Sequence, residues 1–221
     1  MKTKIVSLII ALMGFNINAA QAEDSTLKGN LGVKVTSDYQ RRGEVVSEQS
    51  VQAQLGVNSA VGGVDVFANF FTNQSTDNGR DSNEIVAGVG KDFLDGLVSA
   101  YGGVYNTDFS DAEADLEYFV QVSANVALKP SVSFFRNVDE ELNTFEAKIS
   151  QDFDMKVANL ELSGVLGNTE LSQSLDSTYS AVKAELSREF DELEIYADVA
   201  LSDNDRRDYE TIYGVGVRVR F

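Results

Sequence analysis

The chain has 221 residues and a formal net charge of −17, with 35 acidic and 18 basic side chains. Such an acidic chain lacks the basic surface that nucleic-acid binding requires. It has no cysteine and no histidine, which excludes disulfides, histidine-based catalysis and zinc sites built on these ligands. Serine–lysine or paired-carboxylate catalysis stays formally open. We nevertheless expect no enzyme, with no catalytic residue, no cofactor and no metal ion.

The first 22 residues have the pattern of a secretory signal peptide. Two lysines precede an apolar run over residues 5–15, and Ala20-Gln21-Ala22 places small residues before a cleavage site. We expect cleavage near Ala22 and a single domain over residues 23–221. No later stretch has the roughly 20 apolar residues of a membrane-spanning helix. An exported chain of this kind is either soluble or a closed barrel, because a barrel also satisfies its backbone groups in lipid.

Twelve later segments alternate apolar and polar residues, the period of strands with one apolar face. In chain order they cover residues 27–38, 50–59, 64–73, 84–93, 97–107, 116–126, 131–138, 144–153, 159–167, 178–190, 193–202 and 209–221. The single proline suits continuous hydrogen-bonded ladders. The third and seventh segments carry aromatic residues on both faces, so ten strands is the alternative count.

The connections alternate in length, which predicts the topology. Short turns over residues 60–63, 94–96, 129–130, 154–158 and 191–192 alternate with polar connections over 40–49, 74–83, 108–115, 139–143, 168–177 and 203–208. Outer-membrane barrels have short periplasmic turns and longer outer loops. Both termini then lie on the periplasmic side, and the strand number is even. The fold class expected is all-β, a transmembrane antiparallel up-and-down β-barrel of about 12 strands.

The last strand has the features of a barrel assembly signal. One face carries Tyr213, Val215, Val217, Val219 and Phe221, and the other carries glycine and arginine. A terminal strand that ends on phenylalanine with this alternation resembles the signal of bacterial outer-membrane barrels. We expect the assembly machinery of that membrane, its lipid and its lipopolysaccharide as partners. An edge strand of a soluble sandwich is the alternative.

The polar faces of the strands supply candidates that line a pore. The acidic candidates are Glu84, Glu117, Glu146, Asp152, Glu161, Glu185, Glu194, Asp198 and Glu210, and the basic ones are Lys34, Lys148, Lys183, Arg218 and Arg220. Their acidic excess predicts a passive channel for small solutes with a preference for cations. The alternative is a closed lumen filled by ion pairs, in a structural or surface-binding barrel such as an adhesin or a receptor.

One motif resembles a known family. The segment Thr36-Ser-Asp-Tyr-Gln-Arg-Arg-Gly43, followed by Ser47 and Gln54, is similar to the SDY-x-x-RG-x-S signature of the Gcw_chp family of proteobacterial exported proteins. The resemblance covers roughly residues 31–57 and implies an outer-membrane barrel, without implying a substrate.

The same motif predicts a turn at the mouth of the barrel. Asp38 lies near Arg41 and Arg42 in the sequence, so we expect a charged clasp there. Gly43 permits the positive φ of a tight turn. The segment is either a structural turn or a constriction or ligand contact at the mouth.

Overall fold

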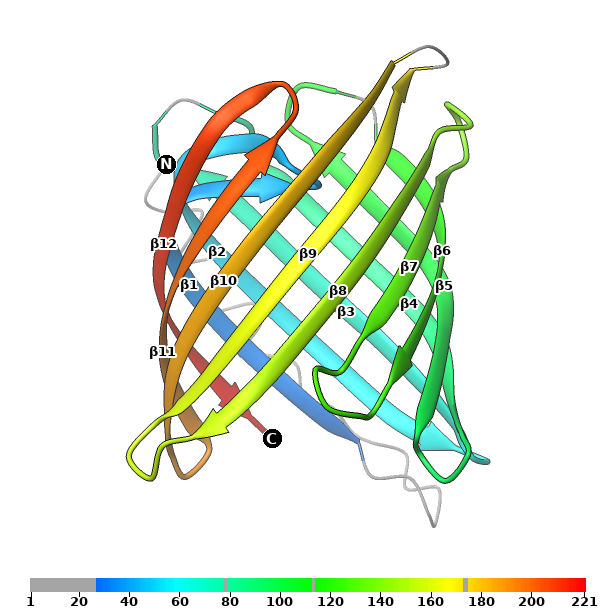
Figure 1. Cartoon of the computed structure of the whole chain (residues 1–221), viewed down its shortest axis with the longest axis vertical. Helices are drawn as coiled ribbons and strands as arrows, with labels where there is room; N and C mark the ends of the chain where they lie inside the picture. The colour runs from blue at the N-terminus through cyan, green and yellow to red at the C-terminus, as the bar shows by residue number, and fades with distance from the viewer. Residues whose placement is uncertain (1–26, 78, 113, 173–174) are drawn as a thin grey trace.

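The computed structural model describes residues 27–77, 79–112, 114–172 and 175–221, so the predicted signal peptide lies outside the described residues. In the described part of the chain, twelve antiparallel strands close into one barrel (Figure 1). The strands are β1 (Lys28–Arg41), β2 (Glu44–Val61), β3 (Val64–Ser75), β4 (Ser82–Phe93), β5 (Val98–Phe109), β6 (Asp115–Ala124), β7 (Ser131–Asn137), β8 (Asn143–Asp154), β9 (Asn159–Ser172), β10 (Leu175–Phe190), β11 (Leu193–Asn204) and β12 (Arg207–Arg220).

Every strand pairs with its neighbours in sequence, and β1 closes the barrel on β12. The predicted all-β barrel of 12 strands is therefore confirmed. The ten-strand alternative is wrong, because β3 and β7 are separate strands that each pair on both sides. Among the described residues, no helix is long and apolar enough to cross a membrane.

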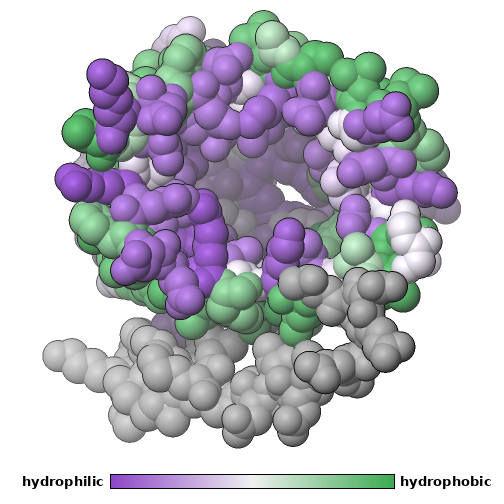
Figure 2. Space-filling model, turned by 90° about the horizontal axis from the view of Figure 1, so that it is seen from below, coloured by the Kyte–Doolittle hydropathy of each residue, from purple (hydrophilic) through white to green (hydrophobic). Residues whose placement is uncertain are grey.

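Side chains alternate between an apolar exterior and a polar interior. On β6, Val120 is 55% exposed on the outside, whereas Glu117 is 3% exposed. Figure 2 shows the same division from the end that holds the C-terminus: a hydrophilic wall surrounds a hollow centre, and hydrophobic residues lie mostly at the periphery. An apolar outer band with a polar interior is the pattern of transmembrane barrels.

Several strand ends differ from the sequence-based prediction. The prediction of a loop over residues 40–49 is wrong, because β1 and β2 continue as a paired hairpin that turns at Arg42 and Gly43. The loop expected over residues 168–177 is also shorter, since β9 runs to Ser172 and β10 starts at Leu175. The polar residues of these segments predict loops. Paired strands can carry polar side chains on both faces where neither face contacts lipid.

Candidate functional site

The tip of the β1–β2 hairpin leaves the barrel wall. β1 pairs with β12 only as far as Thr36, opposite Gly214, and β2 pairs with β3 only from Ser50 onward. The β1–β2 ladder shifts register between Tyr39 and Gln40, and such bulges bend a strand. Residues 37–49, called here the inturned hairpin, therefore cross the end of the barrel opposite the C-terminus (Figure 1).

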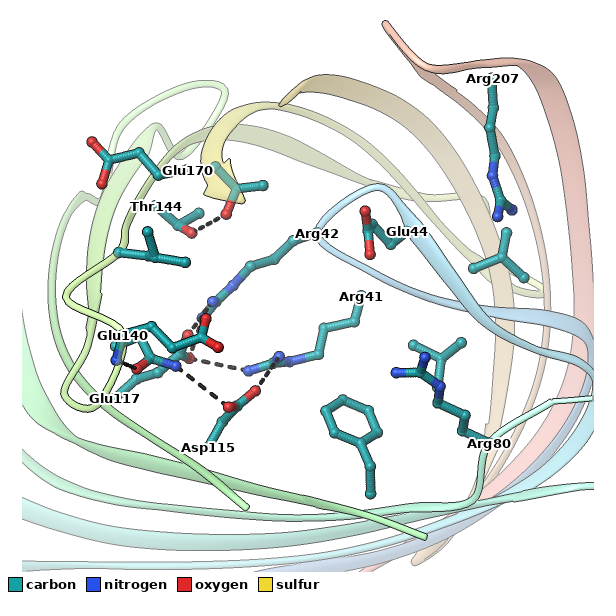
Figure 3. Close-up of a pocket in the computed structure, with 16 residues that line it drawn as sticks. Arg41, Arg42, Glu44, Arg80, Asp115, Glu117, Glu140, Thr144, Glu170 and Arg207 are labelled. Carbon is teal, nitrogen blue, oxygen red and sulfur yellow. Dashed lines mark hydrogen bonds and ion pairs between the residues drawn. The ribbon is translucent and has the colours of Figure 1, made fainter. Parts of the chain in front are cut away.

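Two arginines of the inturned hairpin reach a carboxylate on the far wall. Arg41 Nη2 lies 3.1 Å from Glu117 Oε2, and Arg42 donates to both oxygens of the same carboxylate (Figure 3). Arg41 also lies 3.9 Å from Asp115 on β6. Because β1 and β6 stand on different sides of a 12-strand barrel, these ion pairs span its lumen.

The arginines and their acidic partner are shielded from water. The side chains of Arg41, Arg42 and Glu117 are 15%, 13% and 4% exposed. The Arg42 guanidinium lies 4.3 Å from the ring centroid of Phe135, and that of Arg41 lies 5.3 Å from the centroid of Tyr105. Stacking on aromatic faces stabilises partly desolvated guanidinium groups. The cluster is therefore held by both charge and ring contacts.

Further hydrogen bonds fix the hairpin around the barrel. Tyr39 and Tyr105 each donate to one oxygen of buried Glu84. Gln40 donates to Glu210 on β12, and Asn204 Nδ2 of β11 donates to the Gly43 carbonyl. The hairpin thus contacts β4, β6, β11 and β12, and it rests inside the ring of strands.

Gly43 is the point where the hairpin meets β10. Its φ is +78°, and a Cβ atom there would lie 2.4 Å from Cβ of Tyr179. The predicted positive φ at Gly43 is confirmed, and the lack of a side chain also allows the close approach. Tyr179 is itself buried and donates to Glu146.

The predicted clasp between Asp38 and the two arginines is wrong. Asp38 lies opposite Glu48 in the β1–β2 ladder, and the arginines pair with Glu117 and Asp115 instead. Asp38 is near the two arginines in the sequence, but the bend carries Arg41 and Arg42 away from it. Sequence reasoning also missed the roles of Tyr39, Tyr105, Phe135 and Asp115. The tyrosine of the Ser-Asp-Tyr motif was the available signal.

A second group of the predicted lining residues forms ion pairs in the lumen, between the inturned hairpin and the end that holds the C-terminus. Lys34 lies 2.9 Å from Asp198, and Lys183 lies 2.6 Å from Glu185. Glu194 accepts from Arg218 at 3.0 Å and from Arg220 at 2.9 Å. These pairs join β1, β10, β11 and β12, so one half of the wall is charged but largely self-neutralised.

The remaining candidates lie apart from these pairs. Asp152 contacts Lys129 at the turn before β7, and Glu210 lies 3.8 Å from Arg207. Lys148 alternates with Glu146 and Asp152 along β8 and is exposed. Within the described ranges, Glu161 forms no salt bridge, although its charge acts on Lys129. The structure therefore places the candidates in several clusters and does not gather them into one site.

A cavity of about 400 Å³ lies beside the arginine cluster. Figure 3 shows Arg41, Arg42, Glu44, Glu117, Arg80 and Arg207 around it. Both signs of charge face this space, which is open to solvent. It can admit a small hydrated solute, and its wall offers charged groups and no catalytic constellation.

The fold is similar to that of known outer-membrane proteins. No protein-family model and no curated protein matches the chain. Among solved structures, the KdgM porin has a TM-score of 0.58 at 15% identity, over 87% of this chain and 99% of that one. KdgM in complex with disordered oligogalacturonate has a TM-score of 0.56 at 16% identity, over 88% and 99%. An outer membrane channel from Pseudomonas putida F1 has a TM-score of 0.60 at 8% identity, over 88% and 95%. At these identities the similarity shows the fold.

Proposed function

We propose that this protein is an outer-membrane channel through which small solutes diffuse passively, with a preference for cations. The observation that carries the proposal is a hollow, hydrophilic lumen that the inturned hairpin narrows at one end. In Figure 2 a small gap stays open through the centre of the barrel. The similarity to the KdgM porin and to the Pseudomonas putida channel supports the same class. Loop constrictions inside hollow barrels limit the size of a permeating solute.

The charges of the lumen support a cation preference. At the constriction, Arg41 and Arg42 face Glu117 and Asp115, so charge there is balanced. Toward the end that holds the C-terminus, Asp65 and Glu161 line cavities and form no salt bridge among the described residues. A low-dielectric wall focuses the field of such carboxylates and raises the local concentration of cations.

The second candidate is a barrel with a closed lumen and a structural or surface-binding role. The ion pairs between the hairpin and β6 favour it, because they cross the space that a solute must pass. The two candidates differ in one measurable property, the permeability to ions.

The test is a conductance recording of the purified protein in a planar bilayer. The channel predicts stepwise currents and, under a KCl gradient, a reversal potential of the sign for cation selectivity. The preference should weaken at high salt, since the Debye length falls from about 10 Å at 0.1 M to about 3 Å at 1 M. Replacing both Asp65→Asn and Glu161→Gln should reduce the selectivity, whereas Asp176→Asn, on an exposed residue of β10, should not. Anion selectivity contradicts the charge argument, and the absence of any current favours the closed barrel.

The location in the outer membrane follows from the same proposal. We propose that the signal peptide is removed near Ala22 and that the barrel-assembly machinery recognises the C-terminal strand. Lipid and lipopolysaccharide then surround the apolar outer band. Membership of the Gcw_chp family, which rests on residues 36–43, remains part of this proposal.

A further inference from the structure

Aromatic side chains gather on one half of the lumen wall. Phe67 of β3 lies 6.1 Å from Tyr101 of β5 and 6.3 Å from Phe119 of β6, measured between ring centroids. Phe119 lies 6.1 Å from Phe135 of β7, which lies 6.5 Å from Tyr105. The five rings form a continuous row, called here the aromatic wall, which begins directly beside the arginine cluster.

Glycines on β4 let two of these rings lie along the wall. A Cβ atom on Gly90 would lie 2.2 Å from Cδ1 of Tyr101, and one on Gly88 would lie 2.7 Å from Cζ of Phe67. The rings therefore occupy the space that inward side chains of β4 would fill. The lumen beside them keeps a cavity of about 550 Å³, within the range of about 300–1,000 Å³ typical of small-molecule sites.

Polar side chains border the same cavity. Asn58, Asn69, Gln121 and Asp65 line it together with the aromatic wall. In the described ranges, none of these four side chains has a hydrogen-bond partner in the protein. They therefore offer free donors and acceptors beside an apolar surface. The charged half of the lumen differs, because Lys34, Lys183 and Arg218 there are bound to carboxylates.

We propose that the aromatic wall binds the neutral pyranose rings of a short oligosaccharide as it passes through the lumen. A pyranose has an apolar C–H face that stacks on aromatic rings and an edge of hydroxyl groups that pairs with amides. A purely aromatic solute covers the rings but leaves Asn69 and Gln121 desolvated without partners, which costs binding free energy. This inference rests on the proposed channel function and names the solute class for its lumen.

The test is calorimetric titration of the folded barrel in detergent micelles with maltotriose, a neutral probe. Wild type should bind it with saturation. Tyr101→Leu should weaken binding roughly tenfold, the loss of one stacking surface, and Gln121→Ala should weaken it through lost hydrogen bonds. The matched control is Tyr118→Leu, an aromatic residue that is 57% exposed on the outer face of β6, and it should bind like wild type.

Three results would overturn the proposal: no saturable binding of maltotriose, equal binding by wild type and both lumen variants, or benzyl alcohol displacing maltotriose at equal or higher affinity. If heat-modifiable gel mobility shows that Tyr101→Leu does not fold, the affinity of Gln121→Ala for maltotriose decides whether the proposal stands. Ion conductance without sugar binding contradicts this inference alone. Sugar binding by a barrel that carries no current contradicts the channel and leaves the binding site standing.

Discussion

Arg42, at the turn of the β1–β2 hairpin, contacts both carboxylate oxygens of Glu117 on β6. Arg41 contacts the same carboxylate at 3.1 Å. One buried acid therefore anchors two cations that approach it from another side of the barrel. Removing one member of a buried pair leaves the other charge unpaired, at a cost of about 3–5 kcal/mol. The hairpin can avoid that cost by moving out toward water.

The first prediction concerns this anchor. Glu117→Gln should release the hairpin and enlarge the open section of the lumen, so single-channel conductance should rise. The control is Arg136→Ala, which removes an exposed pair with Glu141 at 3.7 Å and should leave the conductance at the wild-type value. Unchanged conductance in Glu117→Gln, with the hairpin still protected from protease, would show that Glu117 does not hold it.

The second prediction tests the contact between the hairpin and β10 without a change of charge. Gly43→Ala places a Cβ atom 2.4 Å from Tyr179 at a backbone φ of +78°, so the hairpin cannot settle in its place. Conductance should rise as in Glu117→Gln, and proteolysis near Arg41 and Arg42 should become faster. Gly62→Ala is the matched control, since Gly62 also has a positive φ of +60° but nothing within 4 Å of its Cβ position. Equal conductance and equal rates of proteolysis in the two variants would show that the contact at Gly43 does not hold the hairpin in the lumen.

The barrel could be predicted from the sequence because its determinants are local. Alternation along each strand, as at Val120 and Gln121, decides which side faces outward. The lumen could not be predicted equally well, because its contacts join residues far apart in the chain. Arg42 and Glu117 lie 75 residues apart, and only the bend after Thr36 brings them together. The sequence shows only near neighbours, and it therefore predicts a pair between Arg42 and Asp38 instead.

The third prediction tests the face assignment on β6. Arginine near the middle of the bilayer costs about 2–4 kcal/mol on the lipid face of a barrel. Val120→Arg should therefore lower the free energy of unfolding by that amount. Gln121→Arg should have a much smaller effect, because Gln121 lines the lumen cavity. Denaturant titration in micelles measures both, and equal losses at the two positions would contradict the assignment.

The last prediction concerns closure of the barrel. The backbone N–H of Phe221 donates to the Gly29 carbonyl at 2.9 Å, and Gly29 N–H donates to the Phe221 carbonyl at 2.7 Å. The Phe221 ring also lies over Gly29, where a Cβ atom would be 2.4 Å from the ring. Phe221 thus completes the β1–β12 seam and presents the terminal aromatic group of the proposed assembly signal.

Deletion of Phe221 should leave the chain in the periplasm, degraded or aggregated, when membrane fractions are assayed for heat-modifiable barrel. Phe190→Ala, at an exposed phenylalanine that ends β10, should assemble normally. A normal amount of folded barrel without Phe221 would refute the assembly signal.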